Sequence, residues 1–429
     1  MQQPVSNVLS IEQTLFFTLL QVVLIIAAAR IAGFLARKLG QPRAVGEIVA
    51  GLLLGPSLFG ALAPEAFAWV FHSADSAPIS IMSQVGLIML MFQIGLEFDF
   101  SHLSAATNQR AVLLITLAGL LTPFALGLGF GYQSAAFIAP GIEPLGYALF
   151  LATAFSITAV PILGRIMMEF DLVRTRIGAI TISAAGITDA VGWTMLAVIS
   201  AIVTRHFSVE GTAIRIGWLL CYVLICWFAV RQLLRLVIRR FEREGEALPQ
   251  DLLAILLGIV FTSAMLTSKL GIFAIFGGFM MGVLLHDQGA LVAAWKNKVA
   301  DVVTVLFLPI FFTYTGLRTD VGGLVSAELW LWCGLLIGLA VLGKFGGCYV
   351  AARLAGMTQH EARSVAIMMN TRALMELIVV NLGYDLGVIP QNVFTMLVLM
   401  AIVSTLMTAP GLRRWLPGMG HSIPLDRDG

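Results

Sequence analysis

Long apolar segments alternate with short polar ones along almost the whole chain. A helix that crosses the hydrocarbon core of a bilayer needs about 17–25 predominantly apolar residues. The segments that approach this length are roughly 11–36, 43–61, 80–98, 111–133, 146–168, 176–203, 212–234, 251–268, 271–287, 301–317, 329–352, 361–383 and 391–412. The pattern therefore predicts an all-α polytopic membrane protein with about thirteen transmembrane helices.

Lysine and arginine are distributed unevenly among the loops that join these segments. With the N-terminus outside, the inner loops and adjoining helix ends hold most of the positive residues, among them Arg37, Lys38, Arg239 and Arg240. The outer side holds few: Arg205, Arg215, Lys269 and Arg318. Positive residues favour the cytoplasmic side, so the sequence predicts an N-out, C-in protein.

The domain organisation follows from the same pattern. The most polar stretch, residues 239–251, is one loop between seven helices and six, and only a short tail follows Pro410. We therefore expect residues 1–429 to form a single transmembrane unit without a C-terminal soluble regulatory domain. Charged residues make up 12% of the chain, about half the fraction of a soluble domain, and a net charge of +2 gives no reason to expect nucleic-acid binding.

Two of the apolar segments look interrupted rather than continuous. Residues 151–163 contain Pro161, which removes a backbone donor and disfavours helix just before it. Residues 367–378 are interrupted by a cluster of polar residues. We expect broken helices at both places, the fifth and the twelfth in order, crossing within inverted repeats, since such segments at matching positions of two halves indicate a transport site. The polar residues at the two breaks are Ser156, Thr158, Asn370, Thr371, Arg372 and Glu376.

Two ionisable residues lie deep inside apolar runs, Asp189 within 177–193 and Lys344 within 332–347. Such a group at bilayer depth costs about 2.5–3.5 kcal/mol on insertion scales and most often handles ions or protons. A purely structural ion pair between two helices is the alternative. The chain carries no Ser/His/Asp set, metal cluster or phosphate-binding loop, so we expect neither an enzyme nor a cofactor. The cysteines all lie in apolar segments and predict neither a disulfide nor a metal site: Cys221, Cys226, Cys333 and Cys348.

Motifs spread over most of the chain resemble one transporter family. The chain is similar to the second large branch of the monovalent cation:proton antiporters, which includes bacterial Na⁺/H⁺ and K⁺/H⁺ antiporters, the membrane part of glutathione-gated K⁺ efflux systems and plant cation/H⁺ exchangers. The motifs that carry the resemblance are QPRAVGEIVAGLLLGPS at 41–57, FQIGLE at 92–97, SITAVP at 156–161, GITD at 186–189 and MNTRALMELIVV at 369–380.

The resemblance implies a homodimer in which a mobile core slides against a scaffold, an alternating-access elevator. It places the scaffold in the helices of about 11–98 and 251–317, the core in those of about 111–203 and 329–412, and a linker helix at about 212–240. Asp189 would bind the cation or the proton, and Lys344 would face it. The partners implied are K⁺ or Na⁺, H⁺ and membrane lipid, and the location is a bacterial inner membrane.

The pair at the aspartate departs from the family pattern. Thr188-Asp189 stands where relatives carry Asn-Asp, Asp-Asp or Gln-Asp, and a single aspartate implies electroneutral one-for-one exchange. Hard cations prefer oxygen ligands, so the predicted ion- and proton-binding residues are Asp189, Thr188, Ser156 and Thr158, with Lys344 as the coupling lysine. The predicted structural residues of the helix crossing are Pro161, Asn370, Thr371, Arg372 and Glu376.

Two other transport classes remain as alternatives. A gated cation channel would line a pore with the same crossing, but the fixed positive charge of Lys344 argues against it. A sodium-coupled solute symporter on a similar fold needs more polar or aromatic residues at the crossing than the sequence offers. The stretch at 369–380 places K⁺ slightly ahead of Na⁺, and the sequence leaves that choice open.

Overall fold

The computed structural model describes residues 3–73, 75–97, 109–172, 175–203, 217–218, 220–242, 248–270, 274–372 and 374–420, and these contain helices and no strand. The principal helices are α1 (Gln3–Lys38), α2 (Arg43–Leu54), α3 (Pro64–Phe71), α4 (Ala77–Glu97), α5 (Gln109–Ile138), α6 (Pro144–Ser156), α7 (Val160–Glu169), α8 (Arg176–Val203), α10 (Arg231–Glu242), α11 (Gln250–Lys269), α12 (Ala274–Leu285), α13 (Gly289–Lys298), α15 (Leu308–Leu317), α16 (Ala327–Val341), α17 (Gly347–Leu354), α18 (Gln359–Met369), α19 (Leu374–Asp385), α20 (Gln391–Leu406) and α21 (Thr408–Trp415). Short π-helical turns precede or join several of them: η1 (Pro56–Gly60), η4 (Cys226–Val230), η5 (Val303–Phe307) and η6 (Leu342–Gly346).

Eight helices of the described residues are long and apolar enough to cross a membrane, and three shorter apolar helices accompany them. The chain is therefore an integral membrane protein. Two of the predicted spans are divided, because 146–168 is split into α6 and α7 and 361–383 into α18 and α19. The first residues of the predicted span 212–234 lie outside the described part of the chain. Arg205 and Arg215 lie outside it as well.

The helices gather into two compact units. Unit 1 comprises Met1–Ala28, Phe59–Asp99 and Arg205–Tyr314, and unit 2 comprises Ala29–Leu58, Phe100–Thr204 and Thr315–Gly429. In unit 1, α12 packs closely against α4 and α11. A Cβ added at Gly95 or Gly282 would collide with the backbone of the facing helix, so these small residues let α4 and α12 approach.

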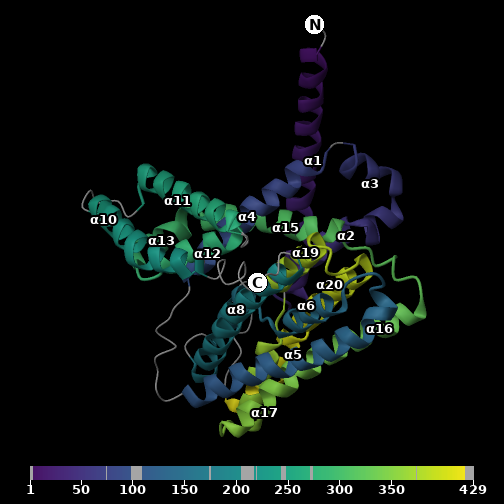
Figure 1. The fold of residues 1–429 in the computed structure, drawn as a ribbon, viewed down its shortest axis with the longest axis vertical. Helices are drawn as coiled ribbons and strands as arrows, with labels where there is room; N and C mark the ends of the chain where they lie inside the picture. The colour runs from purple at the N-terminus through teal and green to yellow at the C-terminus, as the bar shows by residue number, and fades with distance from the viewer. Residues whose placement is uncertain are drawn as a thin grey trace. The chain divides into compact units, whose positions relative to one another are not determined.

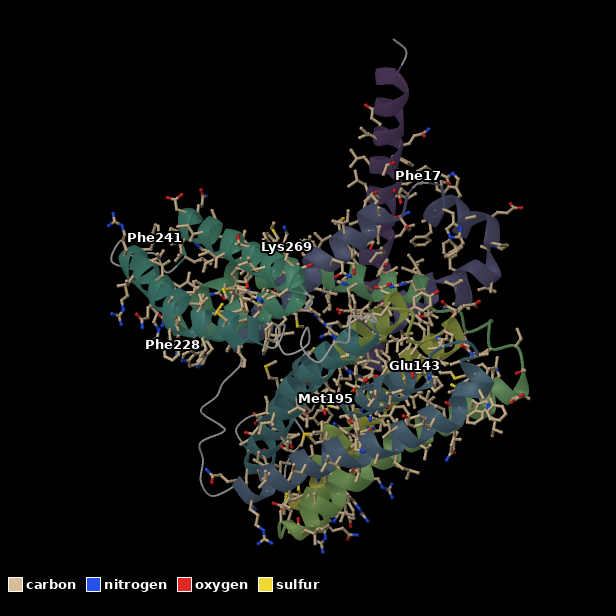
Figure 2. All side chains as sticks on the ribbon, viewed as in Figure 1. Phe17, Glu143, Met195, Phe228, Phe241 and Lys269 are labelled. Atoms are coloured by element: carbon tan, nitrogen blue, oxygen red, sulfur yellow. The ribbon has the colours of Figure 1, made fainter. Side chains whose placement is uncertain are left out.

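Polar contacts tie the remaining helices of unit 1 together. The hydroxyls of Tyr222 and Ser263 lie 2.6 Å apart in the interior. Arg231 and Arg235 of α10 both pair with Asp287, which follows α12. Phe228 lies in η4, the turn that precedes α10, and is labelled in Figure 2. Its side chain is 62% exposed, as expected for a side chain that meets lipid.

Unit 2 is built around α5, which packs along α6 and α17 and also contacts α8 and α16. Figure 1 shows α5 and α16 running side by side. Gly131 permits the close approach of α6, because a Cβ there would lie 2.5 Å from the Cα of Ala148. Glu143, labelled in Figure 2, begins α6 by accepting from the amides of Leu145 and Gly146, which stabilises the N-terminus of that helix.

Candidate functional site

The break predicted in the fifth segment is confirmed. α6 ends at Ser156, the next three residues are not helical, and α7 begins at Val160 with Pro161 in its first turn. A proline fits the first turn of a helix because its missing N–H needs no partner there. Pro161 therefore starts the second half-helix while the residues before it separate the two halves.

The break predicted in the twelfth segment is also confirmed. α18 ends at Met369, Asn370 caps it, Thr371 and Arg372 are not helical, and α19 begins at Leu374. No proline enforces this break. Tertiary hydrogen bonds to the backbone and side chains of these residues stabilise it instead.

The two breaks hydrogen-bond to one another. The amide of Ala159 donates to the carbonyl of Thr371 at 3.0 Å. The hydroxyl of Thr158 donates to the carbonyl of Met369 at 3.4 Å. Segments more than two hundred residues apart in sequence thus satisfy one another's free backbone groups, which fixes the two breaks against each other.

Two buried cations meet the carboxyl end of α6. The last four carbonyls of a helix have no partner within it. Arg372 donates to the carbonyls of Ala154 and Phe155, and Lys344 donates to that of Ser156. The remaining carbonyl, of Thr153, accepts from the amide of Ile157. Positive charge at the carboxyl end also offsets the helix dipole, so the two cations stabilise the broken end of α6.

Lys344 has a second partner that the sequence analysis missed. Its ammonium donates to the carbonyl of Gly119 in α5 at 2.8 Å. That carbonyl is free because Pro123, four residues later, lacks the N–H that would bond to it. A proline inside the apolar run 111–133 is the signal in the sequence that could have identified this contact.

Asp189 lies in the middle of α8 and is 8% exposed. Its carboxylate lies near the amide of Val160, the first residue of α7, and this amide favours its negative charge. Its Oδ1 has no hydrogen-bond partner. The dipole of α7 therefore favours the negative charge of Asp189, while one oxygen is left to bind a proton or a cation.

Asp189 and Lys344 interact electrostatically, yet within the described part of the chain they form no salt bridge. The ammonium of Lys344 is directed instead to the carbonyls of Gly119 and Ser156. The direct ion pair that a purely structural role would require is therefore absent between Asp189 and Lys344. The lysine charge acts on the aspartate through space.

The other predicted ligands are fully buried beside this pair. The hydroxyl of Thr188 donates to the carbonyl of Ala185 within α8, and that of Ser156 has two possible acceptors, the carbonyls of Leu120 at 3.0 Å and Ala152 at 2.8 Å. The hydroxyl hydrogens of Thr188, Ser156 and Thr158 are thus all donated to backbone carbonyls. The hydroxyl oxygens keep lone pairs that can accept a hydrogen bond or coordinate a cation.

The predicted crossing residues separate into two groups. Thr371 and Arg372 are held, Thr371 by a hydroxyl contact of 3.1 Å with Thr408 and Arg372 also by the carbonyl of Ala340. Asn370 and Glu376 are completely buried, and neither side chain has a hydrogen-bond partner. Buried polar groups almost always have one, so these two residues call for a functional explanation.

Comparison with known proteins identifies close relatives. Residues 23–416 match the family described as sodium/hydrogen exchanger, transmembrane. The chain is 35% identical to the Na⁺/H⁺ antiporter NhaS4 of Synechocystis sp. over 95% of this chain and 99% of the relative. It is 36% identical to Cation/H⁺ antiporter 17 of Arabidopsis thaliana over 93% of this chain, and it spans about half of that longer protein, 48%.

Two more distant similarities complete the comparison. The K⁺/H⁺ antiporter 1 of Saccharomyces cerevisiae is 30% identical over 86% of this chain and 43% of its own length. The solved structure of the sodium proton antiporter MjNhaP1 from Methanocaldococcus jannaschii matches with a TM-score of 0.61 at 16% identity, covering 95% of this chain and 98% of that one. The folds are therefore alike.

Proposed function

The chain belongs to the sodium/hydrogen exchanger family, and we propose that it is a secondary antiporter that exchanges K⁺ or Na⁺ for a proton across a membrane. One observation carries the proposal. Asp189 is buried in mid-helix, lies near the first amide of α7, and keeps one carboxylate oxygen without a hydrogen-bond partner. A carboxylate in that setting can hold one small cation or one proton, but not both at once.

Competition between the two ions follows from this geometry. With its proton removed, the Asp189 carboxylate attracts a dehydrated cation, while the charge of Lys344 opposes that cation. Protonation of Asp189 on the other side displaces the cation. A bare, unpaired carboxylate is too costly to move through a low-dielectric barrier, so the site crosses only when occupied, and this requirement couples the two fluxes.

Neutral oxygens complete the proposed cation site. Thr188, Ser156 and Thr158 supply hydroxyl oxygens, and the carbonyls of Ile157 and Thr158 lie in the non-helical break between α6 and α7. Hard monovalent cations bind such oxygens, and the size and field strength of the site select among them. The relatives are named for Na⁺ and for K⁺, which supports both as substrates.

The remaining features of the proposal concern the whole transporter. The core moves against the scaffold as an elevator in a homodimer, the exchange is electroneutral at one for one, and no enzymatic step is involved. Thirteen helices in inverted repeats, N-out and C-in, form each subunit in a bacterial inner membrane. The single aspartate at 188–189 supports the stoichiometry, and the paired breaks support the repeats.

The test is a pH-gradient dequenching assay in proteoliposomes to which Na⁺ and then K⁺ are added. We expect each transported cation to evoke a pH change in the wild type, and the Asp189→Asn variant to fall to the background of empty vesicles. The asparagine amide does not gain or lose a proton at the pH of the assay, so cation movement is no longer coupled to proton movement. The two wild-type amplitudes rank the cations.

Asp301→Asn is the matched control, because Asp301 is an exposed carboxylate on another helix. It should exchange like the wild type. A cation-evoked pH change that survives in Asp189→Asn would contradict the proposal. Isotopic cation flux without any pH change would favour the channel, and Na⁺ flux that requires an organic solute would favour the sodium-coupled symporter.

A further inference from the structure

Pro123 lies in the middle of α5 and is buried. A proline at this position cannot donate to the carbonyl of Gly119, one turn earlier, and its ring clashes with that carbonyl. The ammonium of Lys344 donates to the same carbonyl at 2.8 Å. The proline therefore opens a place in the backbone of α5 that a side chain from a distant helix fills.

The turn that carries Lys344 packs very closely against this part of α5. It is the π-helical turn η6, and single π turns inside α-helices often mark functional sites. A Cβ added at Gly343 would lie 2.9 Å from the Cα of Pro123, and one added at Gly347 would lie 2.1 Å from Oγ1 of Thr122. The hydroxyl of Thr122 also lies 2.9 Å from the carbonyl of Gly343. The two glycines thus permit the approach that brings the ammonium to α5.

The second carbonyl that holds Lys344 lies beside the helix of Asp189. It belongs to Ser156, and the next residue, Ile157, packs on α8, because a Cβ added at Gly192 would lie 2.8 Å from Cγ1 of Ile157. Gly192 follows Asp189 by three residues, so both lie on one side of α8. The ammonium and the carboxylate are therefore both close to the carboxyl end of α6, yet in the part of the chain that the structure describes they make no salt bridge.

We propose that Pro123 is a positioning residue that holds the ammonium of Lys344 on α5 and keeps it away from Asp189. Thr122 and Gly343 complete this clasp. An ammonium released from the clasp would pair with the carboxylate and occupy the oxygen that the cation needs, because opposite charges attract strongly in a low-dielectric interior. The lysine stays charged throughout, so no change of protonation is involved. The inference rests on the proposed antiport function.

The test measures the apparent KM for the transported cation and the maximal exchange rate in proteoliposomes. In Pro123→Ala the new amide takes the carbonyl of Gly119, so Lys344 loses one of the two carbonyls that hold it. We expect KM to rise about tenfold with a nearly unchanged maximal rate, as for a competitor tethered at the site. A proline with a purely structural role would alter the amount of folded protein and leave KM as it is.

Pro309→Ala is the matched control, because Pro309 lies in α15, an apolar helix, within unit 1. It should leave KM unchanged. Thr122→Val should raise KM by less than Pro123→Ala does, and Thr122→Ser, which keeps the hydroxyl, should match the wild type. A wild-type KM in Pro123→Ala would overturn the inference, as would an equal rise in Pro309→Ala.

A second variant covers the case in which Pro123→Ala does not fold. Gly343→Ala pushes η6 away from α5 from the opposite side and should raise KM in the same way. Cation affinity is also measured without turnover, as the cation-dependent rise in Tm of the purified protein. In a Lys344→Gln background, Pro123→Ala should not change that affinity, and a change would show that the proline does not act through the lysine. Absence of wild-type exchange would instead contradict the antiport function itself.

Discussion

The two breaks of unit 2 look alike in backbone outline but differ in what meets the carboxyl end of the first half-helix. At α6, three carbonyls accept from the cations Arg372 and Lys344. At α18, the carbonyls of Met369 and Ile367 accept from the neutral hydroxyls of Thr158 and Thr408. One negative helix end is thus compensated by fixed charge and the other is not.

This difference suggests where a mobile cation can be tolerated. Lys344 and Arg372 occupy the carbonyls of Ala154, Phe155 and Ser156, so these backbone oxygens are closed to a mobile cation. At the end of α18 the described side-chain donors are neutral hydroxyls, and Thr158, one of them, is two residues from Val160, whose amide lies near Asp189. We expect the cation to lie on the Asp189 and Thr158 side of the crossing, away from Arg372.

Arg372→Met removes one of the two positive charges at the carboxyl end of α6 and should have the largest effect on stability. It removes a donor from the carbonyls of Ala154, Phe155 and Ala340, and we expect a loss of about 3–5 kcal/mol in the free energy of unfolding. Denaturant unfolding in detergent measures it. Arg353→Met, which loses one bond to the carbonyl of Met357, should cost far less. Equal stability of Arg372→Met and the wild type would contradict the structural role.

Lys344→Met should cost less, about 1–3 kcal/mol, because two carbonyls lose a donor. Pro123→Ala sharpens this test, since an alanine amide can bond to the carbonyl of Gly119. In the double variant the loss should be smaller than the sum of the single losses, with a coupling of about 0.5–3 kcal/mol. Simple additivity in the same unfolding assay would show that Gly119 is not the partner that matters.

Thr158→Val and Thr408→Val probe the neutral side and should have the smallest effect on stability, about 1 kcal/mol each. They should differ in transport. Thr158→Val should also raise the apparent KM for the cation, because it removes a proposed ligand, whereas Thr408→Val should leave KM unchanged. The Thr→Ser variants keep the hydroxyl and serve as controls. A KM increase of the same size in both valine variants would argue against Thr158 as a ligand.

The sequence predicted both breaks, for different physical reasons. Pro161 stops a helix by covalent geometry, so its effect could be read without a structure. At 370–373 only the polar side chains gave the signal, and the hydrogen bonds that stabilise the break come from residues such as Thr158, Ala159 and Thr405. Local sequence could locate that interruption but could not name its partners.

By itself, the sequence determined the membrane class, the approximate spans, the two interruptions and the isolated charges at Asp189 and Lys344, because hydrophobicity and backbone chemistry are local properties. Only the tertiary structure decided how those charges are used. It directed Lys344 to Gly119 and Ser156 instead of to Asp189, placed Asp189 near the amide of Val160, and left Glu376 buried without a hydrogen bond. Partners distant in sequence are chosen by packing, and no local pattern records that choice.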